Sequence, residues 1–324
     1  MGGVQLRSVH GLMAGILFCA FVFPSAAQNF PSRTMRFYVG FTPGTGSDLV
    51  SRLLAQKMGE RLGQSVIVEQ KISSGGILAS EAVVKSQPDG HTMTLLSGMH
   101  PVLAAMRKSL PYDPVRDFGT VSLVSSYPIL ISVAANSPTK SLSDLLARAK
   151  VAQAVTYSMG STGSMLHLLG EWINMEAGTS MVAVPFSGSG PALVDLLGGR
   201  IDAKIDTATA TFGQMRSGKV RAIALSSLTR YPLAPEVPTI NEVVPGVEAS
   251  SWLGLAVASA TPRPIINRLN SEIRAIIELP DVRKRFAEMG GIPLASTPEE
   301  MRDRIGMEIK RWARVVEKRH IERQ

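Results

Sequence analysis

The sequence predicts an α/β protein of two domains, each built around a mostly parallel sheet flanked by helices, with a two-strand hinge between them. Short apolar segments alternate with longer amphipathic segments along most of the chain, which is typical of strands and helices that form parallel sheets. Two glycine-rich loops, at residues 40–48 and 157–164, each stand between a strand-like and a helix-like segment. Turn signals at residues 136–138 and a proline-rich stretch at residues 230–245 indicate where the chain passes between the domains.

Strands are expected where short apolar runs occur. They cover residues 35–39, 66–69, 92–96, 129–133, 155–157, 181–184, 203–205, 222–225 and 253–256. Helices are expected where apolar residues recur at helical spacing, as Leu49, Leu53, Leu54, Met58 and Leu62 do. They cover residues 48–62, 76–86, 142–150, 165–175, 191–197, 209–217, 263–277 and 298–317.

The turn signals divide the chain into domains. After the first signal, Ser141 is expected to cap a helix that lies in the second domain. Domain one then comprises residues 28–133 and 251–324, and domain two comprises residues 134–250. Two crossings between domains are typical of a hinge that closes around a ligand.

The first 27 residues have the three parts of a secretory signal. Arg7 supplies the positive charge, residues 11–23 form an apolar core too short to span a bilayer, and small residues precede a cleavage site near Ala27. Cys19 is not expected to carry a lipid, because the bulky Phe18 precedes it. We therefore expect an exported protein.

The composition excludes several classes of site. Cys19 is the only cysteine, so a chain cleaved after it has no disulfide, thiolate metal site or cysteine nucleophile. The net charge of +8 comes mostly from scattered Lys and Arg, and the chain has only 3 Trp and 5 Tyr, so nucleic-acid binding is not expected. Because His91, His100, His167 and His320 lack metal-binding spacing, neither a metal nor a cofactor is expected.

The first glycine-rich loop is predicted to bind an anion. Its small residues leave backbone N–H groups free at the N-terminus of the following helix. It lacks the lysine of a nucleotide-binding P-loop, and a plain strand-to-helix turn is the alternative. Asp48 is expected to cap this helix, or to order the loop and leave the other amides to the ligand.

The second glycine-rich loop offers several hydroxyl groups, including those of Ser161 and Thr162, beside glycines that permit a close backbone approach. His167 follows Ser164 at helical spacing, so an exported serine hydrolase is an alternative. No G-x-S-x-G pattern supports that alternative, and no catalytic residue is assigned.

A third turn, at residues 185–191, again joins a strand to a helix. Ser187 and Ser189 can donate hydrogen bonds to a ligand there, and Phe186 can form an apolar wall or join the core. Asp206 lies beside a predicted strand and can face the same cleft or have a structural role alone.

Residues 30–321 resemble the Bug/TctC-type substrate-binding proteins of tripartite tricarboxylate transport systems. No single motif is diagnostic, but their order and spacing together are specific. The motifs are Pro43-Gly44-Thr45-Gly46-Ser47-Asp48, Leu53-Leu54-Ala55-Gln56-Lys57, Pro88-Asp89-Gly90, Leu110-Pro111-Tyr112-Asp113-Pro114, Asp117-Phe118, Pro191-Ala192-Leu193, Leu196-Leu197-Gly198-Gly199, Pro235-Glu236-Val237-Pro238-Thr239, Trp252, Gly254-Leu255 and Thr261-Pro262.

The resemblance implies a type II-like periplasmic binding protein that holds a carboxylate ligand in a cleft between domains. The first loop would grip one carboxylate, the second loop and the third turn would supply the opposite wall, and Asp206 would lie near the pocket. The predicted ligand-binding residues are Phe41, Gly44, Thr45, Gly46, Ser47, Asp48, Gly98, Met99, His100, Ser158, Gly160, Ser161, Thr162, Gly163, Ser164, Phe186, Ser187, Gly188, Ser189 and Asp206.

The same resemblance implies the partners. A monomer would bind a small organic acid and deliver it to membrane permease subunits without performing chemistry, and a ligand sensor that signals to a membrane partner is the alternative. Some positions depart from the family pattern: Thr45 interrupts a glycine run, Phe186 stands where tyrosine is usual, and Met99 and His100 replace small hydroxyl residues. These departures leave the ligand open and admit a less polar acid.

Overall fold

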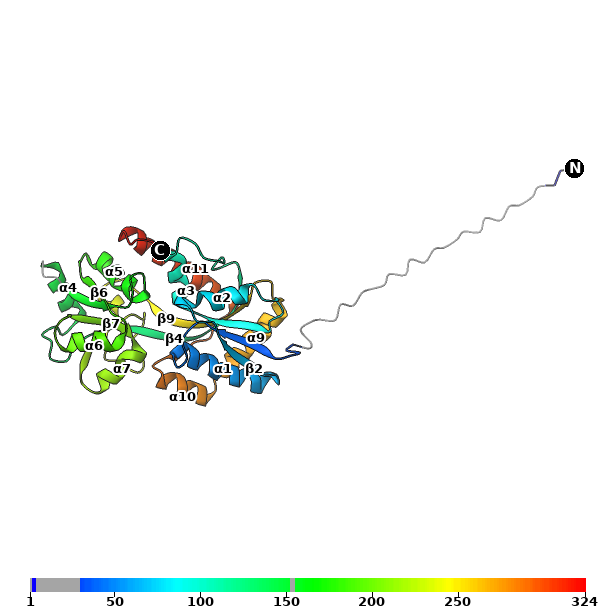
Figure 1. Ribbon diagram of the computed structural model, residues 1–324, viewed down its shortest axis with the longest axis horizontal. Coiled ribbons are helices and arrows are strands. Elements are labelled where there is room, and N and C mark those ends of the chain that lie inside the picture. The colour runs from blue at the N-terminus through cyan, green and yellow to red at the C-terminus, as the bar shows by residue number, and fades with distance from the viewer. Residues whose placement is uncertain (1, 4–29, 152–154) are drawn as a thin grey trace. The chain divides into compact units, whose positions relative to one another are not determined.

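The computed structural model describes residues 2–3, 30–151 and 155–324, and residues 31–324 form one compact unit (Figure 1). The export signal was expected from residues that include Arg7, Cys19 and Ala27, and these three lie outside the described residues. Within the described residues, no helix is both long enough and apolar enough to cross a lipid bilayer.

Ten strands of the described chain are linked by hydrogen bonds, in the order β2-β1-β3-β9-β4-β7-β5-β6, with β8 and β10 each paired to β4. The strands are β1 (Met35–Val39), β2 (Val66–Gln70), β3 (Thr92–Ser97), β4 (Phe118–Ala134), β5 (Thr156–Met159), β6 (Val182–Pro185), β7 (Ala203–Thr207), β8 (Val220–Leu225), β9 (Ser250–Ala258) and β10 (Ile292–Pro293). The predicted α/β class is therefore confirmed.

The long strand β4 belongs to two sheets. Its residues 118–128 pair antiparallel with β9 and β10 in the first sheet, whereas residues 129–134 pair antiparallel with β7 and β8 in the second. The outer strands are parallel, β1 to β2 and β3 in the first sheet and β5 to β6 and β7 in the second. The sheets are more mixed than predicted, because β4 and β9 run back against their neighbours.

Helices cover both sides of each sheet (Figure 1). They are α1 (Gly46–Leu62), α2 (Ile77–Val84), α3 (Met99–Met106), α4 (Leu142–Lys150), α5 (Met165–Ala177), α6 (Ser189–Leu197), α7 (Ala208–Arg216), α8 (Ile240–Val243), α9 (Arg263–Ile277), α10 (Pro280–Glu288) and α11 (Pro298–Lys318). In Figure 1, α2 and α3 lie opposite α1 and α10 around the first sheet, and α4 and α5 lie opposite α6 and α7 around the second.

Several helix ends follow from local side-chain chemistry. Ser141 caps α4 as predicted, since its hydroxyl accepts the Asp144 N–H at 3.1 Å while the Asp144 carboxylate accepts the Ser141 N–H at 3.0 Å. Thr297 and Glu300 form the same capping box at the start of α11. Each box satisfies N–H groups that have no partner within the helix.

The C-terminal helix α11 packs against both sheets. Near its start, Met301 and Ile305 join the buried cluster around Trp252. Further along, the Trp312 ring meets the Trp172 ring of α5 at a centroid distance of 5.7 Å, and Arg319 Nε donates to Glu171 at 2.7 Å. The helix therefore connects elements that the sequence analysis places in different domains.

Every strand and helix expected from the sequence is present, with ends shifted by a few residues. The structure adds the first half of β4, the short strand β10, and the helices α3, α8 and α10.

Candidate functional site

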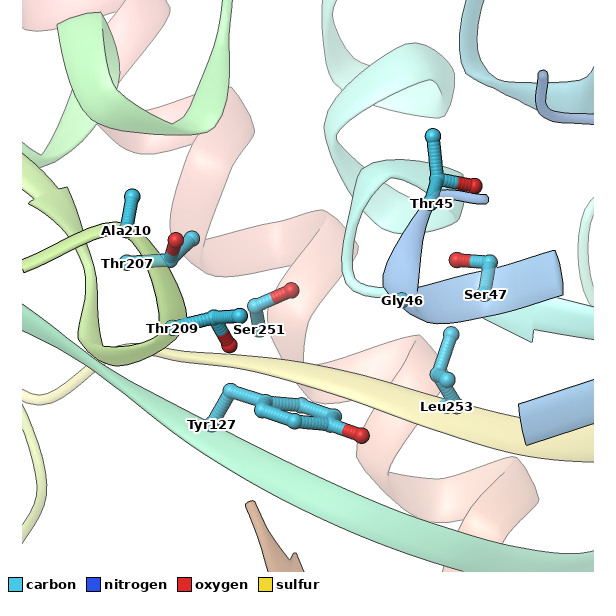
Figure 2. Close-up of a pocket in the computed structure, with 9 residues that line it drawn as sticks. All are labelled: Thr45, Gly46, Ser47, Tyr127, Thr207, Thr209, Ala210, Ser251 and Leu253. Carbon is cyan, nitrogen blue, oxygen red and sulfur yellow. The ribbon is translucent and has the colours of Figure 1, made fainter. Parts of the chain in front are cut away.

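The candidate site is a cavity of about 370 Å³, within the usual range for small-molecule sites. It lies where β4 and β9 pass between the N-termini of α1 and α7 (Figure 2). Its lining residues come from the first glycine-rich loop, from β4 and β9, and from the end of β7 and the first turn of α7. They are Thr45, Gly46, Ser47, Tyr127, Thr207, Thr209, Ala210, Ser251 and Leu253.

One wall of the cavity is the N-terminus of α1. Thr45 is the N-cap residue, but its side chain makes no capping hydrogen bond and instead donates to the Thr42 carbonyl at 2.8 Å. Because the first N–H groups of a helix have no acceptor within it, those of Gly46 and Ser47 are available to an anion. Anion binding by this loop stays a prediction, and these N–H groups are the feature on which it depends.

The Asp48 carboxylate holds this loop in place. It is buried and accepts from Gly44 N at 2.9 Å, from Arg52 Nε at 3.1 Å and from Gln70 Nε2 at 2.7 Å. Burial opposes ionisation, but these hydrogen bonds outweigh it and lower the pKa of Asp48. One of the two expectations for Asp48, that it caps the helix, is wrong. Thr45 is the N-cap residue, and the Asp48 carboxylate accepts instead from the backbone N–H of Gly44.

The opposite wall is the N-terminus of α7. Its N-cap Thr207 also makes no side-chain capping bond, so the first N–H groups of this helix are likewise available. Asp206 accepts from Thr207 N at 2.7 Å and fixes the turn that precedes the helix. Thr209 donates through Oγ1 to the Met289 carbonyl at 2.6 Å, which anchors the first turn of α7 to the segment after α10.

Both carboxylates beside the cavity have a basic partner. Arg52 Nε lies 3.1 Å from Asp48 Oδ2, and Lys204 Nζ lies 2.5 Å from Asp206 Oδ2. The Lys204 side chain is only 2% exposed and the Asp206 side chain 13%, so this second pair is largely shielded from water. The paired charges leave the partial positive charges of the two helix N-termini to dominate the cavity.

The floor of the cavity comes from adjacent strands. In the antiparallel pair of β4 and β9, Tyr127 is opposite Ser251 and Ser125 is opposite Leu253. Burial raises the pKa of Tyr127, and the neighbouring Ser125 hydroxyl moderates the rise. Neither hydroxyl has a hydrogen bond of normal geometry among the described residues.

The second glycine-rich loop does not line this cavity. Ser158 is buried and its hydroxyl accepts from Ile205 N at 3.3 Å. Ser164 caps α5 by accepting the His167 N–H at 3.3 Å, and His167 Nδ1 accepts the Gly163 N–H at 3.1 Å. The Ser164 hydroxyl thus contacts the backbone of His167 and not its imidazole, whereas a serine hydrolase would require a hydrogen bond to the imidazole. The other predicted residues of this loop, Gly160, Ser161 and Thr162, also lie outside the lining.

The third turn also lies away from the lining residues. Phe186 packs against a small buried cluster that includes Leu196 and Ile201. Of the two alternatives for Phe186, an apolar wall or a place in the core, this packing corresponds to the core. Ser187, Gly188 and Ser189 lead into α6 and do not line the cavity.

The segment at residues 98–100 begins α3. A Cβ at Gly98 would lie 3.2 Å from the Ser250 carbonyl oxygen and 2.5 Å from the flexible end of the Met165 side chain, so the backbone approaches β9 closely here. His100 is 2% exposed and stacks on the Tyr112 ring at 5.8 Å. Its Nε2 lies 2.8 Å from the Pro114 carbonyl oxygen, so its side chain packs in the core, and Met99 packs on an adjacent cluster.

Of the predicted residues, Thr45, Gly46 and Ser47 line the cavity, and Gly44, Asp48 and Asp206 order its two walls. Phe41 packs over Gly76 beside the first wall. Sequence reasoning missed six lining residues, namely Tyr127, Thr207, Thr209, Ala210, Ser251 and Leu253. Only Thr207 and Thr209 carried a signal, since they stand between a predicted strand and a predicted helix.

The described residues contain no group of three or more His, Cys, Asp or Glu side chains that could hold a metal ion. The lining residues offer backbone amides, hydroxyl groups and an apolar floor. Such a site can bind and orient an anion.

The chain is similar to known proteins along most of its length. The family described as the tripartite tricarboxylate transporter family receptor matches residues 50–321. Protein BugT of Bordetella pertussis is 34% identical over 320 residues, which cover 98% of each chain. An R. palustris protein solved with adipate is 30% identical, with a TM-score of 0.76, and the match covers 90% of this chain and 99% of that one.

MatC from Rhodopseudomonas palustris, solved with bound malate, is 32% identical with a TM-score of 0.72, over 89% of this chain and 100% of MatC. These likenesses confirm the predicted fold class, that of a two-domain periplasmic binding protein. The chain belongs to the receptor family of the tripartite tricarboxylate transporters, whose members are periplasmic solute-binding proteins and not enzymes.

Proposed function

We propose that this protein binds a small organic acid in the cavity between α1 and α7 and delivers it to the membrane permease of a tripartite tricarboxylate-type transporter. The observation that carries the proposal is that two helix N-termini without side-chain caps line one cavity, through Thr45 and Gly46 on one wall and Thr207 on the other. Each end presents free N–H groups and a partial positive charge.

Two such ends favour an acid with two anionic groups. Several charge-assisted hydrogen bonds in a partly dry cavity are consistent with a micromolar dissociation constant, or about −8 kcal/mol. The adipate and malate bound to the two R. palustris relatives are acids of this kind.

Hinge closure would couple binding to delivery. We propose hinges at residues 128–129 and 249–250, where β4 leaves the first sheet and where the chain enters β9. The domains expected from the sequence, residues 28–133 with 251–324 and residues 134–250, would then meet a few residues earlier, because residues 129–133 of β4 pair within the second sheet. Closure would be needed for Ser161 and Ser187 to reach the ligand that Gly46 binds. A ligand shifts this balance only through its different affinities for the two states.

The remaining parts of the proposal concern location and partners. The signal would be cleaved near Ala27, and the mature protein would act as a monomer. A sensor that presents its closed form to a signalling partner would use the same cavity. Uptake of the acid by cells that lack this gene separates the two, since uptake falls if the protein is a transport receptor and is unchanged if it is a sensor.

A thermal-shift screen of refolded, ligand-free mature protein tests the binding function. The panel contains small mono-, di- and tricarboxylates, amino acids and the uncharged diamides of the same diacids. Ligand at about 1,000 times its dissociation constant adds roughly 4 kcal/mol of stability, which raises the unfolding midpoint by several degrees. We expect a shift with a diacid and none with its diamide. The absence of a shift with every acid would contradict the proposal.

A further inference from the structure

The middle of the cavity differs from its ends. Tyr127 and Leu253, which are 7% and 4% exposed, come from adjacent strands and form the floor. In Figure 2 the Tyr127 ring lies flat between the wall that carries Thr45 and the wall that carries Thr207. A ligand that reaches from one helix N-terminus to the other must therefore pass over this ring.

The polar groups are concentrated at the two ends. Hydroxyl groups and helix N–H groups are supplied by Thr45 and Ser47 on one side and by Thr207 on the other. Among the described residues that line the cavity none is charged. Between the ends, Figure 2 shows Ser251 and Thr209, and the Thr209 hydroxyl already donates to the Met289 carbonyl. A hydroxylated ligand would thus give up water for few partners in the middle of the cavity.

The ring of Tyr127, rather than its hydroxyl, faces the ligand space. The hydroxyl oxygen is buried and has no hydrogen-bond partner among the described residues. Gly291 packs against the ring from the segment after α10, where an added Cβ would lie 2.5 Å from Tyr127 Cε1. A side chain at position 291 would therefore displace the ring, and the glycine allows the Tyr127 ring to occupy the floor.

We propose that the ligand is a dicarboxylate whose two carboxylates are joined by an apolar spacer, an alkyl chain or an aromatic ring, and that Tyr127 and Leu253 select for this spacer. The inference rests on the proposed function, since it assumes that the two helix N-termini bind the two carboxylates. The apolar spacer would be buried against the Tyr127 ring and Leu253. Each hydroxyl on the spacer would instead lose its hydrogen bonds to water and gain no matching partner in the protein.

Calorimetric titration with matched pairs of diacids tests the inference on the refolded mature protein. Each pair has the same carbon chain with and without hydroxyl groups, namely succinate with tartrate and adipate with galactarate, and terephthalate supplies the aromatic spacer. We expect an unsubstituted or aromatic diacid to bind at least about tenfold more tightly than any hydroxylated one. Equal or tighter binding of a hydroxylated partner would overturn the inference and leave the receptor function standing. Failure of every diacid to bind would overturn both.

Two variants test the assigned residues. Tyr127→Asn and Leu253→Asn each place an amide in the floor, and each should reduce the preference for the apolar spacer to about one third or less of the parent value. Leu197→Asn is the control, because Leu197 is 42% exposed on α6 and does not line the cavity. If Tyr127→Asn does not fold, Leu253→Asn still decides the result. An unchanged preference in a folded variant would contradict the role of that residue.

Discussion

Asp48 accepts a hydrogen bond from the backbone N–H of Gly44 at 2.9 Å, so a buried carboxylate holds the loop whose amides form one end of the cavity. A carboxylate near an anion site is expected to repel the ligand. Here it also pairs with Arg52 and accepts from Gln70, so its charge is balanced within the protein. The carboxylate thus contributes order to the loop without exposing its charge to the ligand.

We expect Asp48→Asn to lower the free energy of unfolding by about 1–3 kcal/mol, because an amide cannot accept all three of these hydrogen bonds. Ligand affinity should fall as well, since the Gly46 and Ser47 N–H groups lose their fixed arrangement. Asp144→Asn, a change in the exposed capping box of α4, is the control for helix stability and should leave affinity unchanged. Tighter binding by Asp48→Asn would show that the carboxylate acts mainly as a repelling charge.

Lys204→Met should weaken both folding and binding. The substitution leaves the Asp206 carboxylate without its partner next to the N-terminus of α7, and breaking a buried pair costs about 3 kcal/mol. The unpaired charge should also repel an anionic ligand. The double variant Lys204→Met with Asp206→Asn should recover much of the affinity, as measured by calorimetric titration. Additive losses in the double variant would rule out this charge-balance explanation.

Thr209→Val tests the anchor of α7. The substitution keeps the side-chain shape but removes the hydrogen bond to the Met289 carbonyl. We expect a loss of about 1 kcal/mol in the free energy of unfolding and weaker ligand binding, since the first turn of α7 is no longer fixed. Thr209→Ser retains the hydroxyl and should behave like the parent. If Thr209→Ser loses as much affinity as Thr209→Val, the hydrogen bond is not the cause.

His100 should make stability depend on pH. Burial lowers the pKa of His100 to about 4, and the Pro114 carbonyl only partly opposes this shift. The histidine of the unfolded chain titrates near 6.5, so between these values the unfolded state binds more protons. The free energy of unfolding should therefore fall by about 1.4 kcal/mol per pH unit as pH drops through this window.

His100→Gln should flatten that dependence while retaining a donor for the Pro114 carbonyl. Urea unfolding measured from about pH 7 to about pH 4.5 gives the slope for both proteins. A residual slope is expected, because burial also lowers the pKa of His167. Identical slopes for the parent and the variant would show that His100 does not contribute.

Local patterns predicted the elements that form one wall of the cavity, because the signal and the structure come from the same few residues. The strand, the glycine-rich loop and the amphipathic helix are contiguous at residues 35–62, and the structure places β1 and α1 there. The second wall was assigned to the loop at Ser161. The turn at Thr207 was missed, because it has no glycine and its role depends on a facing helix far away in the chain.

The first half of β4 was missed for a different reason. Its buried polar residues interrupt the apolar pattern, and their hydrogen bonds come from distant segments. Thr120 donates to the Pro298 carbonyl at 2.7 Å, and Ser122 donates to the Ser296 carbonyl at 3.1 Å. No local pattern can foresee partners about 175 residues away. His100 was also missed as a core residue, because its partners lie outside its own helix: its ring stacks on Tyr112, and its Nε2 lies 2.8 Å from the Pro114 carbonyl oxygen.

The central claim is that the helix N-termini bind the anion, and titration of Gly46→Val with the acid found in the screen tests it most directly. A Cβ at Gly46 meets no atom within 4 Å, so the valine side chain should enter the cavity with little effect on folding. Gly306→Val, at a similarly open position in α11, is the control. We predict that Gly46→Val unfolds within about 1 kcal/mol of that control and binds the acid at least about tenfold more weakly than the parent. Equal binding by Gly46→Val and the parent would contradict the account.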